Sequence, residues 1–236
     1  TSFRSLGYGN NDQFLIAGAH IGAGQQSLNF SDLWFSRQFD QDQAIVDFDA
    51  DSGEGNLNNT SDVYLDFSAG ILWYALMGEN TNIYAGASML HINGPNISFV
   101  DGSTESLYNR IVVHVGGELM MTRNLSFLPG VAYMKQGPSM EINAGGNFRF
   151  TNHDWREIAI RTGLWARVAN RLDNSVLMDA LIVNAVLELE RFNLGISYDV
   201  NTSSLIGASN SRGAFEVSFI YTTQERTRSR VNCPKF

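Results

Sequence analysis

The feature that most constrains this chain is a two-residue alternation of apolar with polar or small side chains, which recurs along most of its length. Residues 63–77 show it best, with one apolar set at the odd positions: Val63, Leu65, Phe67, Ala69, Ile71, Trp73, Ala75 and Met77. Successive side chains of a β-strand point to opposite faces, so the pattern predicts a strand with one apolar face and one face that can contact water.

Similar alternation predicts ten strands in this chain, although two of them have partly apolar residues on both faces. The predicted strands are residues 12–28, 63–77, 81–91, 108–121, 125–135, 139–150, 157–168, 177–189, 191–200 and 213–223. Most are long enough to cross a bilayer at a tilt, which takes about 9–11 residues. The sequence therefore predicts an all-β fold, a transmembrane antiparallel β-barrel domain over residues 1–223.

The connections between these strands alternate in length. Short turns are predicted at residues 78–80, 122–124, 151–156 and 190–191, and longer loops at 29–62, 92–107, 169–176 and 201–212. One connection on the long side, residues 136–138, is short. Outer-membrane barrels have short periplasmic turns and longer external loops. The alternation thus predicts an outer-membrane location, with the chain leaving the last strand on the periplasmic side.

Composition agrees with a membrane barrel and excludes other classes. Charged residues make up 17% of the chain, against roughly 25% in ordinary soluble domains. No stretch approaches the ~20 consecutive apolar residues of a spanning helix, so any membrane crossing must use strands. The net charge of −8 argues against nucleic acid, whose binders carry clustered basic residues.

Several segments together resemble the PorP/SprF family of the type IX secretion system, the outer-membrane machinery of gliding and adhesin-secreting bacteria. They are residues 26–35 (QSLNFSDLWF), 66–74 (DFSAGILWY), 84–96 (YAGASMLHINGPN), 194–199 (LGISYD), 213–221 (GAFEVSFIY) and the ending 231–236 (VNCPKF). The resemblance covers nearly the whole chain. It implies a barrel of about fourteen strands, within the range known for such barrels, whose N-terminal strands are missing from this chain.

The resemblance also implies a function, which is written here as an expectation. The protein would be a barrel component of the type IX secretion and gliding motility machinery, with no enzymatic activity and no cofactor. Its partners would be other secretion components and an exported or surface-attached cargo protein such as an adhesin. Two alternatives stay open, because fold does not fix function: a passive outer-membrane channel for small apolar or sugar-like solutes, and a soluble all-β binding module.

The long predicted loop at residues 29–62 contains the candidate partner-binding residues Trp34, Phe35 and Phe39. Large apolar side chains on an exposed loop usually mark a partner surface or a contact with neighbouring loops. The same loop carries Asp47, Asp49 and Asp51 at alternate positions, as in calcium-binding loops. The glycine and the final glutamate of that motif are out of place, so a solvated acidic loop is the alternative to calcium.

Charged residues also occur on the predicted lumen face and in the last residues. Glu141, Arg149, Glu157, Arg161 and Arg167 are expected to pair across the lumen, in a structural network or in gating. Residues 224–236 form a basic periplasmic tail, which is either solvated or docked to an acidic partner. Its notable residues are Arg226, Arg228, Arg230 and Cys233. Cys233 is the only cysteine, so any disulfide partner would have to lie outside these residues.

The four histidines are scattered without the spacing of metal ligands, and no serine, histidine and aspartate fall in a catalytic order that the strands would support. The sequence therefore offers no candidate catalytic residue.

Overall fold

The structure is a computed structural model that describes residues 2–4, 12–29, 33–53, 58–77, 81–152, 158–170, 175–203 and 213–223. Eleven of its strands form one antiparallel sheet. These strands are β1 (Ser2–Arg4), β2 (Gln13–Gly24), β5 (Tyr64–Leu76), β6 (Asn82–Leu90), β7 (Arg110–Thr122), β8 (Leu125–Gln136), β9 (Ser139–Thr151), β10 (Ala159–Asn170), β11 (Val176–Glu188), β12 (Phe192–Asn201) and β13 (Phe215–Tyr221). Two short strands, β3 (Phe39–Asp40) and β4 (Ile45–Val46), pair separately.

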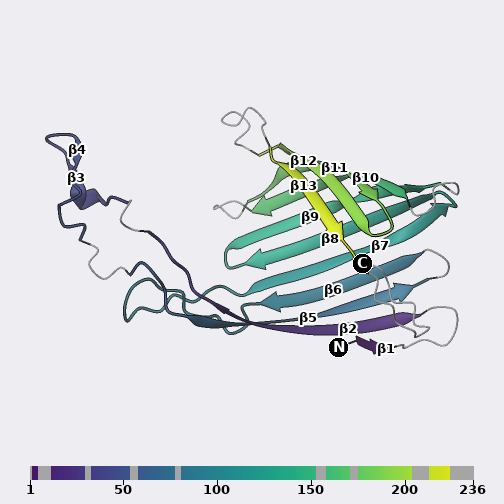
Figure 1. Ribbon diagram of the computed structural model, residues 1–236, viewed down its shortest axis with the longest axis horizontal. Coiled ribbons are helices and arrows are strands. Elements are labelled where there is room, and N and C mark those ends of the chain that lie inside the picture. The colour runs from purple at the N-terminus through teal and green to yellow at the C-terminus, as the bar shows by residue number, and fades with distance from the viewer. Residues whose placement is uncertain are drawn as a thin grey trace.

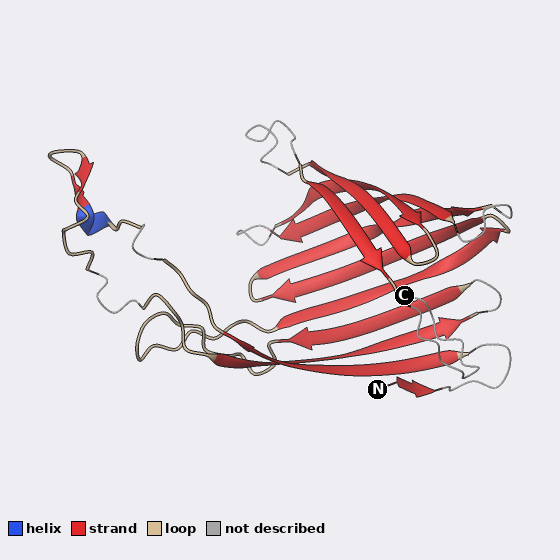
Figure 2. Ribbon diagram, in the orientation of Figure 1, coloured by secondary structure: helices blue, strands red, loops and turns tan. Residues whose placement is uncertain are grey.

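The eleven strands follow one another in space as they do in the sequence, apart from the small β3–β4 pair that is inserted between β2 and β5. Figure 1 shows the resulting sheet, which curls along this order, and Figure 2 shows that strands make up nearly all of its regular structure. Among the described residues, β1 and β13 are the two edges of the sheet. No helix in the described part of the chain is long and apolar enough to cross a membrane.

All ten predicted strands are present, and the chain has the fold of a transmembrane antiparallel β-barrel protein. The prediction missed three short strands, β1, β3 and β4. It also ran the first long strand to residue 28, whereas β2 ends at Gly24 and only an isolated bridge, Ser27 to Thr60, continues beyond it.

Register explains the alternation seen in the sequence. Across β2, β5 and β6, for example, Ile71 lies beside Ala17 and Ala87, and all three lie on one face. This outer face exposes large apolar side chains, and Ile71 keeps 57% of its surface exposed. The opposite, inner face carries the polar and glycine positions, and charged side chains meet across it.

Small residues on the inner face accommodate aromatic rings from neighbouring strands. The indole of Trp165 lies over Gly145 and Gly130, where an added Cβ would come within 2.8 and 2.7 Å of the ring. Tyr84 covers Gly116 in the same way. Gly116, Gly130 and Gly145 are therefore packing positions, at which a larger side chain would clash with the ring.

The connections sort by length between the two ends of the sheet. One end, called here the turn end, carries the connections after β5, β7, β9 and β11; the other, the loop end, carries those after β2, β6, β8, β10 and β12. The loop-end connection at residues 137–138 is a tight turn in which Gly137 has φ +55°, a conformation that favours glycine. The predicted exception is thus confirmed, and most connections follow the predicted alternation. The connection after β10 does not, because its residues 171–175 are fewer than the residues 152–158 of the turn-end connection after β9.

Candidate functional site

The loop end carries an extension of the sheet that consists of a base and an arm. The base comprises residues 25–29 and 58–62 together with the loop at residues 91–109, and the arm comprises residues 33–53. Asn58 ties the two parts of the base together: its backbone N–H donates to the Phe99 carbonyl at 2.8 Å, and its side-chain amide donates to Asp101 at 2.6 Å. Figure 1 shows the β3–β4 hairpin of the arm well away from the sheet.

Gln38 organises the arm. It ends the short 3-10 helix Ser36–Gln38 and is one of the few buried polar residues, with 8% of its surface exposed. Its side-chain oxygen accepts the Phe35 N–H at 3.0 Å, and its amide donates to the Ala50 carbonyl at 3.2 Å. Its backbone carbonyl accepts the N–H of Asp47 at 2.8 Å. One buried glutamine therefore joins the beginning of the arm to its end.

The surface of the arm is apolar around this centre. Trp34, Ile45 and Phe48 expose 52%, 52% and 62% of their surface. Phe39 is also exposed, and its ring centroid lies 6.0 Å from that of Trp34. Two predicted partner-binding residues, Trp34 and Phe39, thus form one exposed aromatic pair. The third, Phe35, is half-buried beside Gln38.

The candidate calcium ligands lie on the same arm, but their carboxylates serve local turns. Asp47 accepts the N–H of Asp49 at 3.0 Å, and Asp51 accepts the N–H of Gly53 at 3.1 Å. Within the described ranges, no three acidic, histidine or cysteine side chains are grouped so as to hold a metal ion. Calcium binding at Asp47, Asp49 and Asp51 therefore stays a prediction without geometric support.

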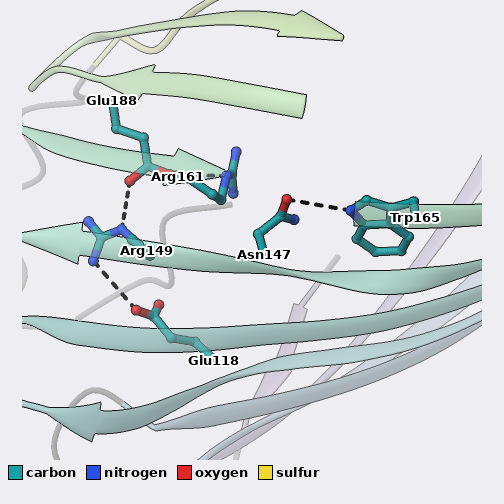
Figure 3. Close-up of polar contacts among 6 residues, drawn as sticks. All are labelled: Glu118, Asn147, Arg149, Arg161, Trp165 and Glu188. Carbon is teal, nitrogen blue, oxygen red and sulfur yellow. Dashed lines mark hydrogen bonds and ion pairs between the residues drawn. The ribbon is translucent and has the colours of Figure 1, made fainter. Parts of the chain in front are cut away.

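A charged network lies on the inner face toward the turn end. Figure 3 shows Arg149 of β9 between two carboxylates, that of Glu118 on β7 and that of Glu188 on β11. The Arg149 Nε donates to Glu188 at 2.7 Å, and its Nη1 lies 3.4 Å from Glu118. The contact with Glu118 spans β8, and the contact with Glu188 spans β10. Long side chains can span a strand in this way on the concave face of a curved sheet, where they converge.

The same network holds two like charges together. Arg161 lies directly opposite Arg149 in the β9–β10 register, an arrangement that is destabilising when the two charges are not compensated. Glu188 contacts both guanidinium groups, since its second oxygen lies 3.5 Å from the Arg161 Nε. Two carboxylates therefore balance two arginines at the turn end.

A second network lies nearer the loop end and is centred on Arg167. Its Nη2 is 2.8 Å from Asp199, and two other carboxylates, those of Glu141 and Asp179, are each 3.9 Å away. Of the lumen charges singled out in the sequence, the three arginines do meet carboxylates across the inner face, and Glu141 is one of the carboxylates near Arg167. Glu157 lies outside the described residues.

Sequence reasoning missed several members of these sites. They are Gln38, Ile45 and Phe48 of the arm, and Glu118, Asp179, Glu188 and Asp199 of the inner face. The two-residue alternation predicts which face of the sheet Glu118 and Asp199 occupy. Only the register between strands shows which arginine each of them contacts. The tail residues Arg226, Arg228, Arg230 and Cys233 lie outside the described residues.

Comparison with known families gives one match, which spans most of the chain. The sequence model of the family described as "Type IX secretion system membrane protein PorP/SprF" matches residues 5–221. No curated protein matches the chain.

Proposed function

The chain belongs to the PorP/SprF family of type IX secretion system membrane proteins, and we propose that it is an outer-membrane barrel that supports export or surface attachment of cargo proteins such as adhesins. The family is a membrane component of a secretion system rather than an enzyme family. Association with other components of that system follows from membership. The cargo role and the outer-membrane location are the parts that we propose.

One observation supports the cargo role most directly, namely the arm at the loop end. Its aromatic pair and the exposed Ile45 and Phe48 place large apolar surface on a segment that projects from the sheet. Scattered single apolar residues need no explanation, but several on one projecting segment favour a protein partner. We propose that the loop end is external and that the arm contacts the cargo.

The outer face supports the membrane part of the proposal. It exposes large apolar side chains along most of the long strands, including Ile71, Val115, Leu164 and Ile196. Exposed apolar surface of this extent is unfavourable in water and favourable against hydrocarbon. We therefore propose that lipid covers this face, and that the inner face lines the lumen.

The experiment that tests the cargo role is affinity purification from cell envelopes, followed by mass spectrometry. The wild-type protein is compared with a double variant of the arm, Trp34→Ser with Phe48→Ser, and with Val100→Ser, which removes an exposed apolar side chain from the base. We expect the arm variant to lose cargo but to retain the other secretion components, and the Val100 variant to retain both. Undiminished cargo in the arm variant would contradict the proposal.

A passive channel is the second candidate, and the polar inner face is the observation that favours it. The guanidinium and carboxylate groups around Arg167 suit a wet lumen. Swelling of proteoliposomes in isotonic solutions of small sugars distinguishes the candidates. A channel would admit the sugars and would bring no cargo through affinity purification, whereas a secretion component is identified by the cargo that it retains.

A further inference from the structure

Among the described residues of β9 to β13, the inner face near the loop end carries more acid than base. The carboxylates of Glu141, Asp179, Asp199 and Glu216 accompany one guanidinium, that of Arg167, which gives a formal charge of 1 − 4 = −3. Arg167 forms one short contact, 2.8 Å to Asp199, and two long ones. Glu216 has no basic partner among the described residues. This differs from the turn-end network, in which two arginines balance two carboxylates.

A hollow of about 390 Å³ lies in the same region, between β9 and β13. Arg167 and Glu216 line it, together with Asn143 and Asn184. The side-chain oxygens of both asparagines are buried and accept no hydrogen bond within the described part of the chain. The amide of Asn143 is already used, because it donates to Glu141 at 2.6 Å.

Buried amide oxygens normally have a hydrogen-bond donor, and excess carboxylates favour a cation. A guanidinium group supplies both, because it is always charged and carries five N–H donors and no acceptor. The chemistry of the hollow therefore suits an arginine-bearing segment better than a neutral sugar or an anion.

The chain carries such a segment directly after β13. Arg226, Arg228 and Arg230 occupy alternate positions, so in an extended conformation their side chains lie on one face. Glu216 lies five residues before the end of β13 at Tyr221, which is about 17 Å of strand. The nine residues from 222 to 230 span up to about 30 Å, so Arg228 and Arg230 can return to the level of Glu216, whereas Arg226 is too close to the end of β13 to do so.

We propose that the basic segment 224–236 docks in this hollow on the inner face, with its arginines against Glu216, Asp199 and the two buried amide oxygens. Tethering favours this occupant over a free ligand, because a short flexible link gives an effective concentration in the millimolar range. The segment would then fill part of the barrel interior and hold the last strand, β13, against its neighbours.

The test is cysteine crosslinking in the full-length protein in its membrane, with Cys233→Ser as background. Asn232→Cys, on the same face as the three arginines if the segment is extended, is combined either with Ser218→Cys, which lines the hollow, or with Val217→Cys, which lies on the outer face one residue away. A short thiol-to-thiol crosslinker is added, and linked peptides are identified by mass spectrometry. We expect linkage to position 218 and none to position 217. A tail that merely stays near the end of β13 would link both.

A folding check and two further measurements make the result decisive. Each variant is first shown to be folded by the shift in its gel mobility on heating, and arginine-to-glutamine changes at 226, 228 and 230 should then abolish linkage to position 218. High salt should reduce it, because the contact is ionic. Equal linkage at both positions, no linkage in a folded protein, or linkage of Asn232→Cys to another protein would each overturn the proposal.

Discussion

The sheet and the arm hold their shape in different ways. In the sheet, β2 pairs with β5 without interruption from Gln13 opposite Ala75 to Gly24 opposite Tyr64. The other long strands also pair along most of their length, with register shifts only between β7 and β8 and between β10 and β11. In the arm, β3 and β4 share only two residue pairs, and one buried side chain, that of Gln38, joins the ends. Stability is thus spread along the sheet and concentrated in the arm.

This difference indicates where each region tolerates change. In the sheet, the face that a side chain occupies matters more than its identity, because the backbone pairing persists and only the environment of the side chain changes. In the arm, most surface residues are free to vary if the Gln38 contacts remain. Such an arrangement suits a rigid membrane scaffold that carries a variable recognition segment.

The largest effect is expected from a charge on the outer face of the sheet. Ile71 lies near the middle of β5 with 57% of its surface exposed. If lipid covers this face, Ile71→Arg should cost about 2–4 kcal/mol of unfolding free energy. Urea unfolding of the protein in lipid vesicles measures this cost.

Ser68→Arg is the matched control for that change. Ser68 lies on the same strand and pairs with His20 on the inner face, where an arginine meets polar groups. Its effect should be far smaller than that of Ile71→Arg. Equal losses from the two substitutions would show that the faces have been assigned wrongly.

A smaller loss is expected from the turn-end network of the inner face. Glu188→Gln removes the carboxylate shared by Arg149 and Arg161 and leaves these two directly opposed guanidinium groups with Glu118. The cost should be about 1–2 kcal/mol of unfolding free energy. Glu190→Gln, in the exposed turn two residues later, should cost almost nothing. A loss no larger than the control's would mean that the network does not contribute to stability.

The sequence was sufficient to predict the ten longer strands, because alternation over seven to thirteen residues leaves little ambiguity; β1, β3 and β4, of two or three residues, are too short to show it. Two predicted strands alternated poorly, and both take part in a register shift, β7 between Met120 and Thr122 and β11 at Asp179. Between Arg167 and Val168 of β10 the register with β11 shifts, so that Asp179 has no partner opposite it. A bulge of this kind breaks the two-residue period, and sequence alone does not distinguish it from a weak strand.

The candidate site was less predictable, because its central contacts join distant residues. Gln38 looks like a surface residue in sequence, and its burial depends on Ala50 and Asp47 folding back over it. Glu188 meets Arg149, which is 39 residues away, and only the registers of the intervening strands bring them together. Trp34 and Phe39 were predictable because large aromatic residues in a long loop are informative by themselves.

A local effect without global loss is expected in the arm. Gln38→Ala removes the side-chain bonds to Phe35 and Ala50, each worth about 0.5–1.5 kcal/mol. Hydrogen exchange should become faster across residues 35–50, while unfolding of the sheet is unchanged. Gln41→Ala, at an exposed position of the same hairpin, should leave exchange as it is. Slow exchange in the Gln38 variant would show that other contacts hold the arm.

The last prediction concerns the orientation of the two ends and involves no change in stability. Gln43 is exposed in the β3–β4 turn of the arm, and Arg123 is exposed in the β7–β8 turn at the opposite end of the sheet. With Cys233→Ser as background, a cysteine is placed at one of these positions, and intact cells are treated with a membrane-impermeant thiol reagent. If the loop end is external, Gln43→Cys should be labelled and Arg123→Cys should be protected.

Permeabilised cells provide the control for that experiment, because the reagent then reaches both sides of the membrane and both cysteines should react. A cysteine that stays unlabelled in permeabilised cells is covered by the protein itself and does not report on orientation. The reverse pattern would place the arm in the periplasm, where it could not meet cargo at the cell surface, although the sheet and its register would be unaffected. Protection of Gln43→Cys only in cells that produce cargo would instead strengthen the proposal, because it would place the partner on the arm. The comparison of sheet and arm therefore leads to separate tests: the sheet substitutions examine the fold, and the labelling examines the function assigned to the arm.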